Sequence, residues 1–362
     1  MVKKYFRNVY LSFLVHVFDI PPRFLAFLML IIFLLLPITG LTESILIMLI
    51  IANLFAIYGA SWDLLVGRTG QISLGHALFF GIGGYVTALL YVNLKLEPWA
   101  SVSIAALIGF LVAGLIGFPC LRVKGPYLAL VTMAFPLIMM GLVYYFKDIT
   151  GGEYGLFGIP RFFPFLNYFQ QRLAEYYFTL VLMFISSIII YKIANSKTGI
   201  VFVSILDDEL ASKASGINVT KYKIMAFAIS GLFTSLVGAV YAHIFRSVSA
   251  SSFTLSMSFI PVIMTIFGGI GTIYGPISAA YILQVLDRYI LSVTIPLSTE
   301  WRNIIYAAIV IILILKWPRG LARIVVDKLE DIEEARPIEV VYQKMKKKKE
   351  PSGGSTNAPS RS

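Results

Sequence analysis

Long apolar segments follow one another along almost the whole chain, and they restrict the possible folds more than any other feature. A helix needs roughly 17 to 25 apolar residues to cross the hydrocarbon core of a membrane. Candidate segments lie at approximately 24–39, 42–66, 74–93, 98–118, 127–146, 176–195, 223–244, 253–268, 275–294 and 303–317. Because open structures other than helices leave backbone groups unpaired in lipid, we predict an all-α polytopic membrane protein with about ten transmembrane or re-entrant helices.

The composition agrees with this fold class and limits the chemistry. Hydrophobic residues make up 58% of the 362 residues and charged residues 14%, with a mean hydropathy of +0.83, far from the balance of soluble domains. The single cysteine, Cys120, excludes an internal disulfide framework, and His16, His76 and His243 are too scattered for a zinc pattern. We therefore expect no metal site and no cofactor.

The net charge of +11 is distributed in a way that indicates membrane topology. Basic residues stand at the ends of apolar segments and do not interleave with exposed aromatic residues on one domain, so a nucleic-acid partner is not expected. If both termini are cytoplasmic, most of the Lys and Arg residues fall on the inner side, as the positive-inside rule requires. We predict a multi-pass protein of a bacterial or archaeal cytoplasmic membrane with this orientation. All four tryptophans fall near segment ends, where the rings suit the headgroup layer.

This topology divides the chain into three parts. Residues 1–23 form a cytoplasmic N-terminal segment, residues 24–317 form the transmembrane domain, and residues 318–362 form a cytoplasmic tail of basic and mixed charge. The tail contains KMKKKKE, which could contact anionic lipid, and ends in PSGGSTNAPSRS, which is predicted to be disordered.

An external segment at 147–175 is long enough to hold function. It contains TGGEYGLFGIP followed by the aromatic stretch RFFPFLNYF. We predict a glycine-rich turn and a helix that lies along the membrane interface. Gating or docking is one interpretation, and an ordinary connector with aromatic anchors is the other.

A cytoplasmic loop at 196–222 contains a short predicted helix. Asp207, Asp208 and Glu209 occupy its first turn, where carboxylates interact favourably with the helix dipole. Gly216 stands where such a helix would stop, and Ala211 belongs to a small-residue surface between them. The helix is suited to receiving force from a soluble partner; the alternative is a solvated loop helix.

The stretch GQISLGHALFFGIGGY, residues 70–85, places polar groups and glycines at membrane depth. Such backbone is tolerated only where protein or a water-filled cavity surrounds it. We predict that the glycines break the helix or allow close helix contact. The candidates for contact with a substrate or pathway are Gly70, Gln71, Ser73, Gly75 and His76. For His76 the alternative is a structural hydrogen bond to a neighbouring helix.

The chemistry of nucleotide use and of catalysis is missing from the sequence. No glycine is followed by lysine, so the phosphate-binding loop G-x-x-x-x-G-K-[ST] does not occur. No histidine is spaced with a carboxylate in a hydrolase signature. We therefore do not expect an enzyme.

Three stretches together resemble the permease subunits of branched-chain amino-acid ABC importers: GQISLGHALFFGIGGY, then RVKGPYLALVTMAF at 122–135, then TGGEYGLFGIP at 150–160. The resemblance continues through DDELASKASGINVTKYKIMAFAISGLFTSLVGAVYA, FGGIGTIYGPISAA and KWPRGLARI, and covers approximately residues 45–324. Each stretch alone is unspecific, whereas the ordered combination is specific. Within the family, the chain is most similar to the longer of the two paired permeases.

The resemblance implies the permease fold of ABC importers and a set of partners. These are a second related permease subunit, two cytoplasmic ATPase subunits, an external substrate-binding protein and the lipid bilayer. It implies that the stretch around Glu209, Ala211 and Gly216 is the ATPase-coupling loop. It also implies docking of the binding protein near 147–175, for which the candidate residues are Thr150, Gly151, Gly152 and Glu153.

The implied function is ATP-driven import of branched-chain or other apolar amino acids by alternating access, with ATP hydrolysis in the partner subunits. A permease for urea or short amides is an alternative within the same class. An ATP-independent channel or secondary carrier is an alternative of another class, and a membrane scaffold is a third. A carrier would be favoured by ionisable residues buried in mid-helix; Glu43 and Asp63 are predicted to lie near segment ends.

Overall fold

The computed structural model describes residues 33, 36–39, 42–120, 123, 125–288, 299–317 and 320. Apart from Phe33, all of them belong to one compact unit, Leu34–Arg323. The predicted N-terminal segment 1–23 and nearly all of the tail 318–362 lie outside the described residues, as does most of the first predicted crossing, 24–39.

In the part of the chain that the structure describes, six helices are long and apolar enough to cross a membrane. They are α3 (Glu43–Thr69), α4 (His76–Leu94), α5 (Pro98–Cys120), α6 (Pro126–Tyr145), α8 (Tyr168–Ala194) and α11 (Val219–Phe245). The all-α polytopic membrane class is therefore confirmed, whereas the predicted number of about ten crossings is not confirmed within the described part of the chain.

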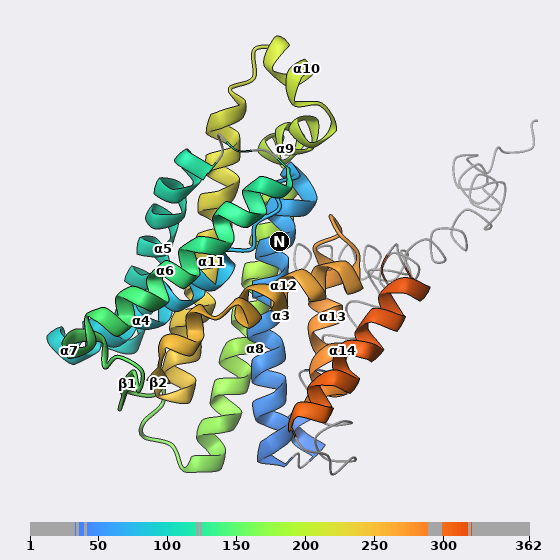
Figure 1. Ribbon diagram of the computed structural model, residues 1–362. Helices are drawn as coiled ribbons and strands as arrows, with labels where there is room; N and C mark the ends of the chain where they lie inside the picture. The colour runs from blue at the N-terminus through green and yellow to red at the C-terminus, as the bar shows by residue number, and fades with distance from the viewer. Residues whose placement is uncertain are drawn as a thin grey trace, which may run out of the picture. The chain divides into compact units, whose positions relative to one another are not determined.

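Shorter elements connect and flank these six (Figure 1). The helical ones are η1 (Leu36–Thr39), α7 (Lys147–Thr150), α9 (Lys197–Asp207), α10 (Glu209–Ala214), η2 (Ala250–Phe253), α12 (Leu255–Gly268), α13 (Tyr274–Gln284) and α14 (Thr299–Lys316). Two short strands, β1 (Leu156–Phe157) and β2 (Ser247–Val248), pair antiparallel with Leu156 opposite Val248.

Helix ends follow local sequence signals. Helix α3 stops at Gly70, whose backbone is left-handed at φ +69° and whose N–H bonds the carbonyl of Val66, as expected for a glycine just after a helix. Proline begins α5 at Pro98 and α6 at Pro126, where its missing N–H costs nothing.

The centre of the unit is formed by α11 with α4 and α5, and α3 packs beside them. Glycine makes this packing close. A Cβ atom at Gly83 would lie 2.0 Å from the carbonyl oxygen of Ser235, and one at Gly238 would lie 1.9 Å from that of Phe80. Helix α4 runs unbroken through Gly83, so the predicted break was wrong and the predicted close helix contact is confirmed.

The segment after α6 does not contain the predicted interfacial helix. Gly151, Gly152 and Gly155 have positive φ and turn the chain into β1, and Gly158, which follows β1, has positive φ too. Residues 161–167 are irregular, and the next helix, α8, is a long spanning helix that begins at Tyr168. Pro160 and Pro164 in this stretch lack the N–H that a continuous helix would need.

Candidate functional site

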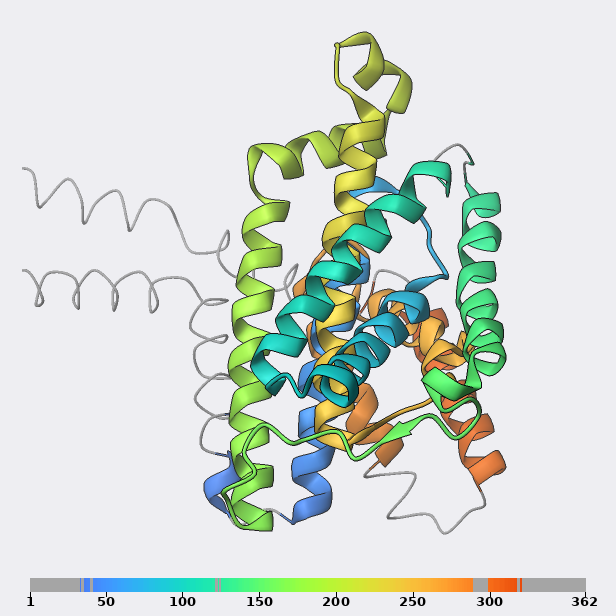
Figure 2. The same ribbon diagram turned by 90° about the vertical axis from the view of Figure 1, so that its left-hand side faces the viewer.

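Helices α9 and α10 lie at the end of the bundle opposite β1 and β2 (Figures 1 and 2). Helix α9 turns Gly199, Phe202 and Ile205 into the protein, and all three are buried. Ser196 caps its start by accepting a hydrogen bond from the N–H of Gly199. The pair is therefore anchored by apolar contacts on the α9 side, and α10 is left largely at the surface.

Asp208 is the residue that starts α10. Its Oδ1 accepts hydrogen bonds from the N–H groups of Leu210 at 2.8 Å and Ala211 at 3.0 Å, which is the usual role of aspartate at a helix N-cap. Glu209 follows in the first turn, as predicted. Asp207 does not: it is the last residue of α9, because the extended backbone of Asp208, φ −153° and ψ 108°, separates the two helices.

The end of α10 also follows the prediction. The helix stops at Ala214, and Gly216 adopts φ +83° two residues later, a conformation that glycine reaches without steric cost. Within α10 the small residues differ in exposure: Ala211 is exposed, whereas Ser212 is buried against α9 and donates a hydrogen bond to the carbonyl of Ser204 at 2.9 Å.

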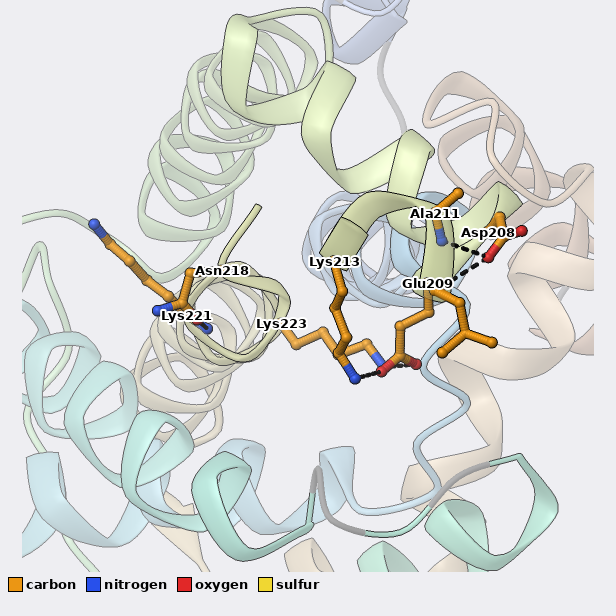
Figure 3. Close-up of polar contacts among 8 residues, drawn as sticks. Asp208, Glu209, Ala211, Lys213, Asn218, Lys221 and Lys223 are labelled. Atoms are coloured by element: carbon orange, nitrogen blue, oxygen red, sulfur yellow. Dashed lines mark hydrogen bonds and ion pairs between the residues drawn. The ribbon is translucent and has the colours of Figure 1, made fainter. Parts of the chain in front are cut away.

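Glu209 forms ion pairs with two lysine side chains (Figure 3). Its Oε1 lies 2.7 Å from Nζ of Lys213, one turn further along α10, and its Oε2 lies 2.8 Å from Nζ of Lys223 on α11. The second contact connects two helices. Neither lysine was singled out from the sequence for this role, because the pairing of Glu209 with Lys223 depends on how α10 folds back beside α11.

The polar segment between α3 and α4 is held on several sides. The indole Nε1 of Trp62 donates to the carbonyl of Ser73 at 2.8 Å, and the N–H of Leu74 donates to Oγ1 of Thr132 on α6 at 3.0 Å. Gln71 and Ser73 are buried, whereas Gly70 is exposed. Trp62 is itself buried, so its predicted place in the headgroup layer was wrong; its ring fixes the segment that follows its own helix.

His76 opens α4 in the protein interior. Its Nε2 lies 2.7 Å from Oγ of Ser230 on α11, and that hydroxyl donates to the carbonyl of Ser61 on α3 at 2.7 Å. Since Ser230 has one proton to give, Nε2 of His76 is the donor in the first bond. His76 has no exposed surface, and this geometry favours the structural reading of His76 over a substrate contact. Gly75 adjoins it, and a Cβ there would lie 2.5 Å from the carbonyl oxygen of Thr132.

Asp63 is fully buried on α3 and binds the loop between α12 and α13. Its Oδ1 accepts a hydrogen bond from the N–H of Gly271 at 2.6 Å, and its Oδ2 accepts one from the N–H of Ile273 at 2.8 Å. Gly271 and Ile273 both have positive φ. Asp63 lies in the last two turns of α3, near the segment end as predicted, but its burial and its two backbone partners were not predicted. Two features of the sequence could have indicated this contact. One is the lone carboxyl group in an apolar segment, and the other is the glycine-rich run GGIGTIYG elsewhere in the chain.

A second buried ionic group lies on α8. Nη1 of Arg172 is 2.9 Å from Oε2 of Glu175, and Nε of Arg172 is 3.5 Å from Oε1 of Glu43. Glu175 has no exposed surface. The predicted crossing began at 176 and left both residues in the external segment; the helix begins at Tyr168 and includes them.

The four candidates for external docking form a compact turn. Oγ1 of Thr150 donates to the carbonyl of Val143 at 2.6 Å, Gly151 and Gly152 have positive φ, and Glu153 is exposed. The turn leads to a contact that was missed from the sequence. Nδ1 of His243, near the end of α11, lies 2.7 Å from the carbonyl oxygen of Pro160.

His243 is buried, and its ring connects the carbonyl of Pro160 to two further helices. Its Nε2 lies 2.8 Å from Oγ1 of Thr87 on α4 and 3.2 Å from Oγ of Ser101 on α5. From the sequence His243 was considered only as a metal ligand, since nothing in the sequence brings Pro160, Thr87 and Ser101 to one place.

Comparisons with known proteins agree with the sequence resemblance. Residues 44–314 match the family described as "Branched-chain amino acid transport system / permease component". The chain is 28% identical over 291 residues to the high-affinity branched-chain amino acid transport system permease protein LivM of Salmonella typhimurium, covering 74% of this chain and 67% of the relative. The protein of that name from Escherichia coli gives the same values.

An archaeal protein is also similar. It is the "Probable branched-chain amino acid transport permease protein LivM" of Methanocaldococcus jannaschii, which is 24% identical over 291 residues, covering 73% of this chain and 84% of the relative. No solved structure matches the chain.

Proposed function

Because the chain belongs to the family of branched-chain amino acid transport permeases, we propose that it is the membrane-spanning subunit of an ATP-driven importer for these amino acids. The observation that carries the proposal is the family match over residues 44–314, which covers the six candidate spanning helices except for Glu43, the first residue of α3. A transport subunit of this kind needs a membrane domain and a place where energy is delivered. We further propose that it corresponds to the longer of the two paired permeases of such importers.

Energy is supplied by partner subunits in this proposal. The sequence has no phosphate-binding loop of the G-x-x-x-x-G-K-[ST] type, and the α9–α10 pair at one end of the bundle offers a compact surface for an ATPase subunit. Asp208 and Glu209 shape α10, Ala211 is exposed on it, and Gly216 follows it. The full assembly would contain a second related permease subunit, two ATPase subunits and an external substrate-binding protein.

The proposed orientation places the α9–α10 pair and both termini in the cytoplasm, in the cytoplasmic membrane of a bacterium or archaeon. The turn that contains Thr150, Gly151, Gly152 and Glu153 then faces outside, where the binding protein docks. Glu153 is the exposed charged side chain of this turn. The divisions at 1–23, 24–317 and 318–362 belong to the same proposal.

Transport proceeds by alternating access along a pathway bordered by the segment between α3 and α4. Gly70 is exposed, and Gln71 is buried with an Oε1 atom that has no hydrogen-bond partner among the described residues. Ser73, Gly75 and His76 hold the segment against α3, α6 and α11, respectively. A zwitterionic amino acid needs polar partners at membrane depth, because stranding one charge there costs about 2.5 to 3.5 kcal/mol or more. Gln71 is therefore the first side chain to test for substrate contact.

The secondary-carrier alternative gains one observation from the buried groups Asp63 and Glu175. Both are fully buried on spanning helices, and buried ionisable groups in membrane helices often mark ion pathways. However, both oxygens of Asp63 are occupied by backbone N–H groups, and Glu175 is paired with Arg172. Such fixed partners suit a structural role better than a proton or ion relay.

The deciding experiment is uptake by the complex purified through a tag on this chain and reconstituted in liposomes. We expect leucine accumulation that requires ATP and the external binding protein, with competition by isoleucine and valine. Accumulation without ATP would favour the carrier. Competition by urea alone would favour the urea and amide branch, and loss of all uptake with every partner present would favour a scaffold. Gln71→Ala is expected to raise the KM for leucine, with His76→Ala as the structural comparison.

A further inference from the structure

We propose that Lys223, through its ion pair with Glu209, is a positioning residue that makes α10 and α11 move as one body. A displacement of α10 would then pass directly to the helix at the centre of the bundle. The inference rests on the proposed function, in which an ATPase subunit acts on the α9–α10 pair.

The backbone between the two helices cannot enforce common movement by itself. Helix α10 ends at Ala214 and α11 begins at Val219, so residues 215–218 connect them. Gly216 in this link has φ +83°, and glycine changes its backbone conformation more readily than any other residue. A push on α10 would bend the chain at Gly216 unless a side-chain contact holds the two helices together.

The Glu209–Lys223 pair provides such a contact (Figure 3). The distance from Oε2 to Nζ is 2.8 Å, and the side chain of Lys223 is 12% exposed, against 48% for Lys213. Charge pairs screened from water are weakened less by salt than exposed ones. Lys213 neutralises the same carboxylate from within α10, so it cannot join the helices and is a natural control.

A separate contact attaches α10 to α9. Oγ of Ser212 donates to the carbonyl of Ser204 at 2.9 Å, and the two hydroxyl oxygens are 3.0 Å apart. This contact holds the pair of short helices together without reaching α11. The two attachments can therefore be tested independently by changing Ser212 or Lys223.

Helix α11 is suited to carry a displacement through the unit (Figure 2). It is a single helix of 27 residues without proline. It packs closely on α4, where Oγ of Ser235 donates to the carbonyl of Phe79 at 2.8 Å. At its far end His243 is bound to the carbonyl of Pro160, and β2 pairs with β1. Coupling between distant sites needs such a connected set of packed elements.

The test uses the complete importer in liposomes with its external binding protein. Lys223→Gln is expected to lower the number of leucine molecules taken up per ATP hydrolysed several-fold, while ATP hydrolysis and subunit composition are retained. Lys223→Arg should keep the wild-type ratio of leucine to ATP. Lys213→Gln should keep it too, although it also removes one positive charge next to the carboxylate of Glu209. An unchanged ratio in Lys223→Gln overturns the inference. If the wild-type complex shows no ATP-dependent uptake, it is the proposed function that fails.

A covalent link provides a test that does not depend on charge. In a Cys120→Ser background, the double variant Glu209→Cys/Lys223→Cys should show the reduced ratio while its thiols are free. Joining the two thiols with a short bifunctional reagent should restore the ratio, because it restores common movement. Transport that stays low or stops after linkage overturns the inference, since the helices would then need to separate. This holds even if Lys223→Gln fails to assemble.

Discussion

Two carboxyl groups in this chain each hold a short segment in place through both oxygens, one in the interior and one at the surface. Asp63 accepts backbone N–H groups from Gly271 and Ile273 and is fully buried. Glu209 binds the ammonium groups of Lys213 and Lys223, and its side chain is 21% exposed. The partners of Asp63 are fixed dipoles that have no alternative in the interior, whereas the partners of Glu209 are flexible side chains that water can replace.

The difference teaches that the two groups contribute to different properties. An N–H group that is left unpaired in the interior carries the full free-energy cost of its removal from water. Asp63 therefore contributes mainly to the stability of the fold. A partly exposed ion pair such as Glu209–Lys223 contributes less to stability, so the main contribution of Glu209 is to the position of α10. Four predictions test this comparison.

The largest loss in the free energy of unfolding is expected from Asp63→Ala. It leaves the N–H groups of Gly271 and Ile273 unpaired, at about 1–3 kcal/mol for each donor. Asp63→Asn should cost less, because one oxygen still accepts. The free energy of unfolding in mixed detergent micelles measures both. If Asp63→Ala destabilises the chain no more than Glu209→Ala, the distinction between interior and surface fails.

Gly67→Ala should disturb the same interior site without removing the carboxyl group. A Cβ at this position would lie 2.5 Å from Oδ1 of Asp63 and 2.5 Å from the backbone nitrogen of Gly271. Backbone atoms cannot swing aside, so we expect a loss of about 1–3 kcal/mol.

The matched control for this substitution is Gly141→Ala in α6, where, in the described part of the chain, no atom beyond the neighbouring residues and the backbone of its own helix lies within 4 Å of the added atom. It should cause no loss. Equal melting temperatures for the two variants would show that the loop containing Gly271 can move away from α3 at little cost, and would contradict the close packing of Gly67 on Gly271.

A smaller stability effect is expected from Lys223→Gln. An ion pair at a partly exposed site contributes about 0.2–1 kcal/mol, and this contribution should shrink as salt is raised. Unfolding at low and high salt measures it. The loss caused by Asp63→Ala should change little over the same range of salt, because its partners are buried dipoles.

Lys213→Gln should cause the smallest loss in the free energy of unfolding. The pair with Glu209 lies within one helix, where such contacts contribute about 0.3–0.5 kcal/mol. A loss of stability larger than that of Lys223→Gln, measured in the same titration, would contradict the assignment of Lys223 as the residue that joins the helices.

Much of the fold followed from sequence patterns because those patterns are local. The apolar segments at 42–66 and 98–118 became α3 and α5 within a few residues, since length and hydropathy decide which segments can enter lipid. The stop of α10 near Gly216 was predictable for the same reason, and its start was predicted to within about two residues, because Asp207 was placed in the first turn and instead ends α9. Each depends on the chemistry of one residue and its immediate neighbours.

The candidate site was only partly predictable. The sequence predicted that protein or a water-filled cavity surrounds GQISLGHALFFGIGGY. The glycines within α4 do not break the helix: Gly81 lies against Phe253 of η2, and Gly83 lies against Ser235 of α11. Periodicity cannot distinguish a glycine that bends a helix from one that admits a neighbouring helix. The start of α8 was missed because Arg172 and Glu175 lower the hydropathy of its first turns, and their mutual pairing is invisible in the sequence.

The sequence by itself determined that this chain resembles a family of helical membrane permeases, where several of its long helices run, and that a short helix with acidic residues at its start ends near Gly216. Only the tertiary structure decided that Asp63 meets Gly271, that Glu209 meets Lys223 and that His243 meets Pro160. The physical reason is range. Hydropathy and capping act over a few neighbouring residues, whereas these contacts join residues far apart in the chain and form only once the helices have packed.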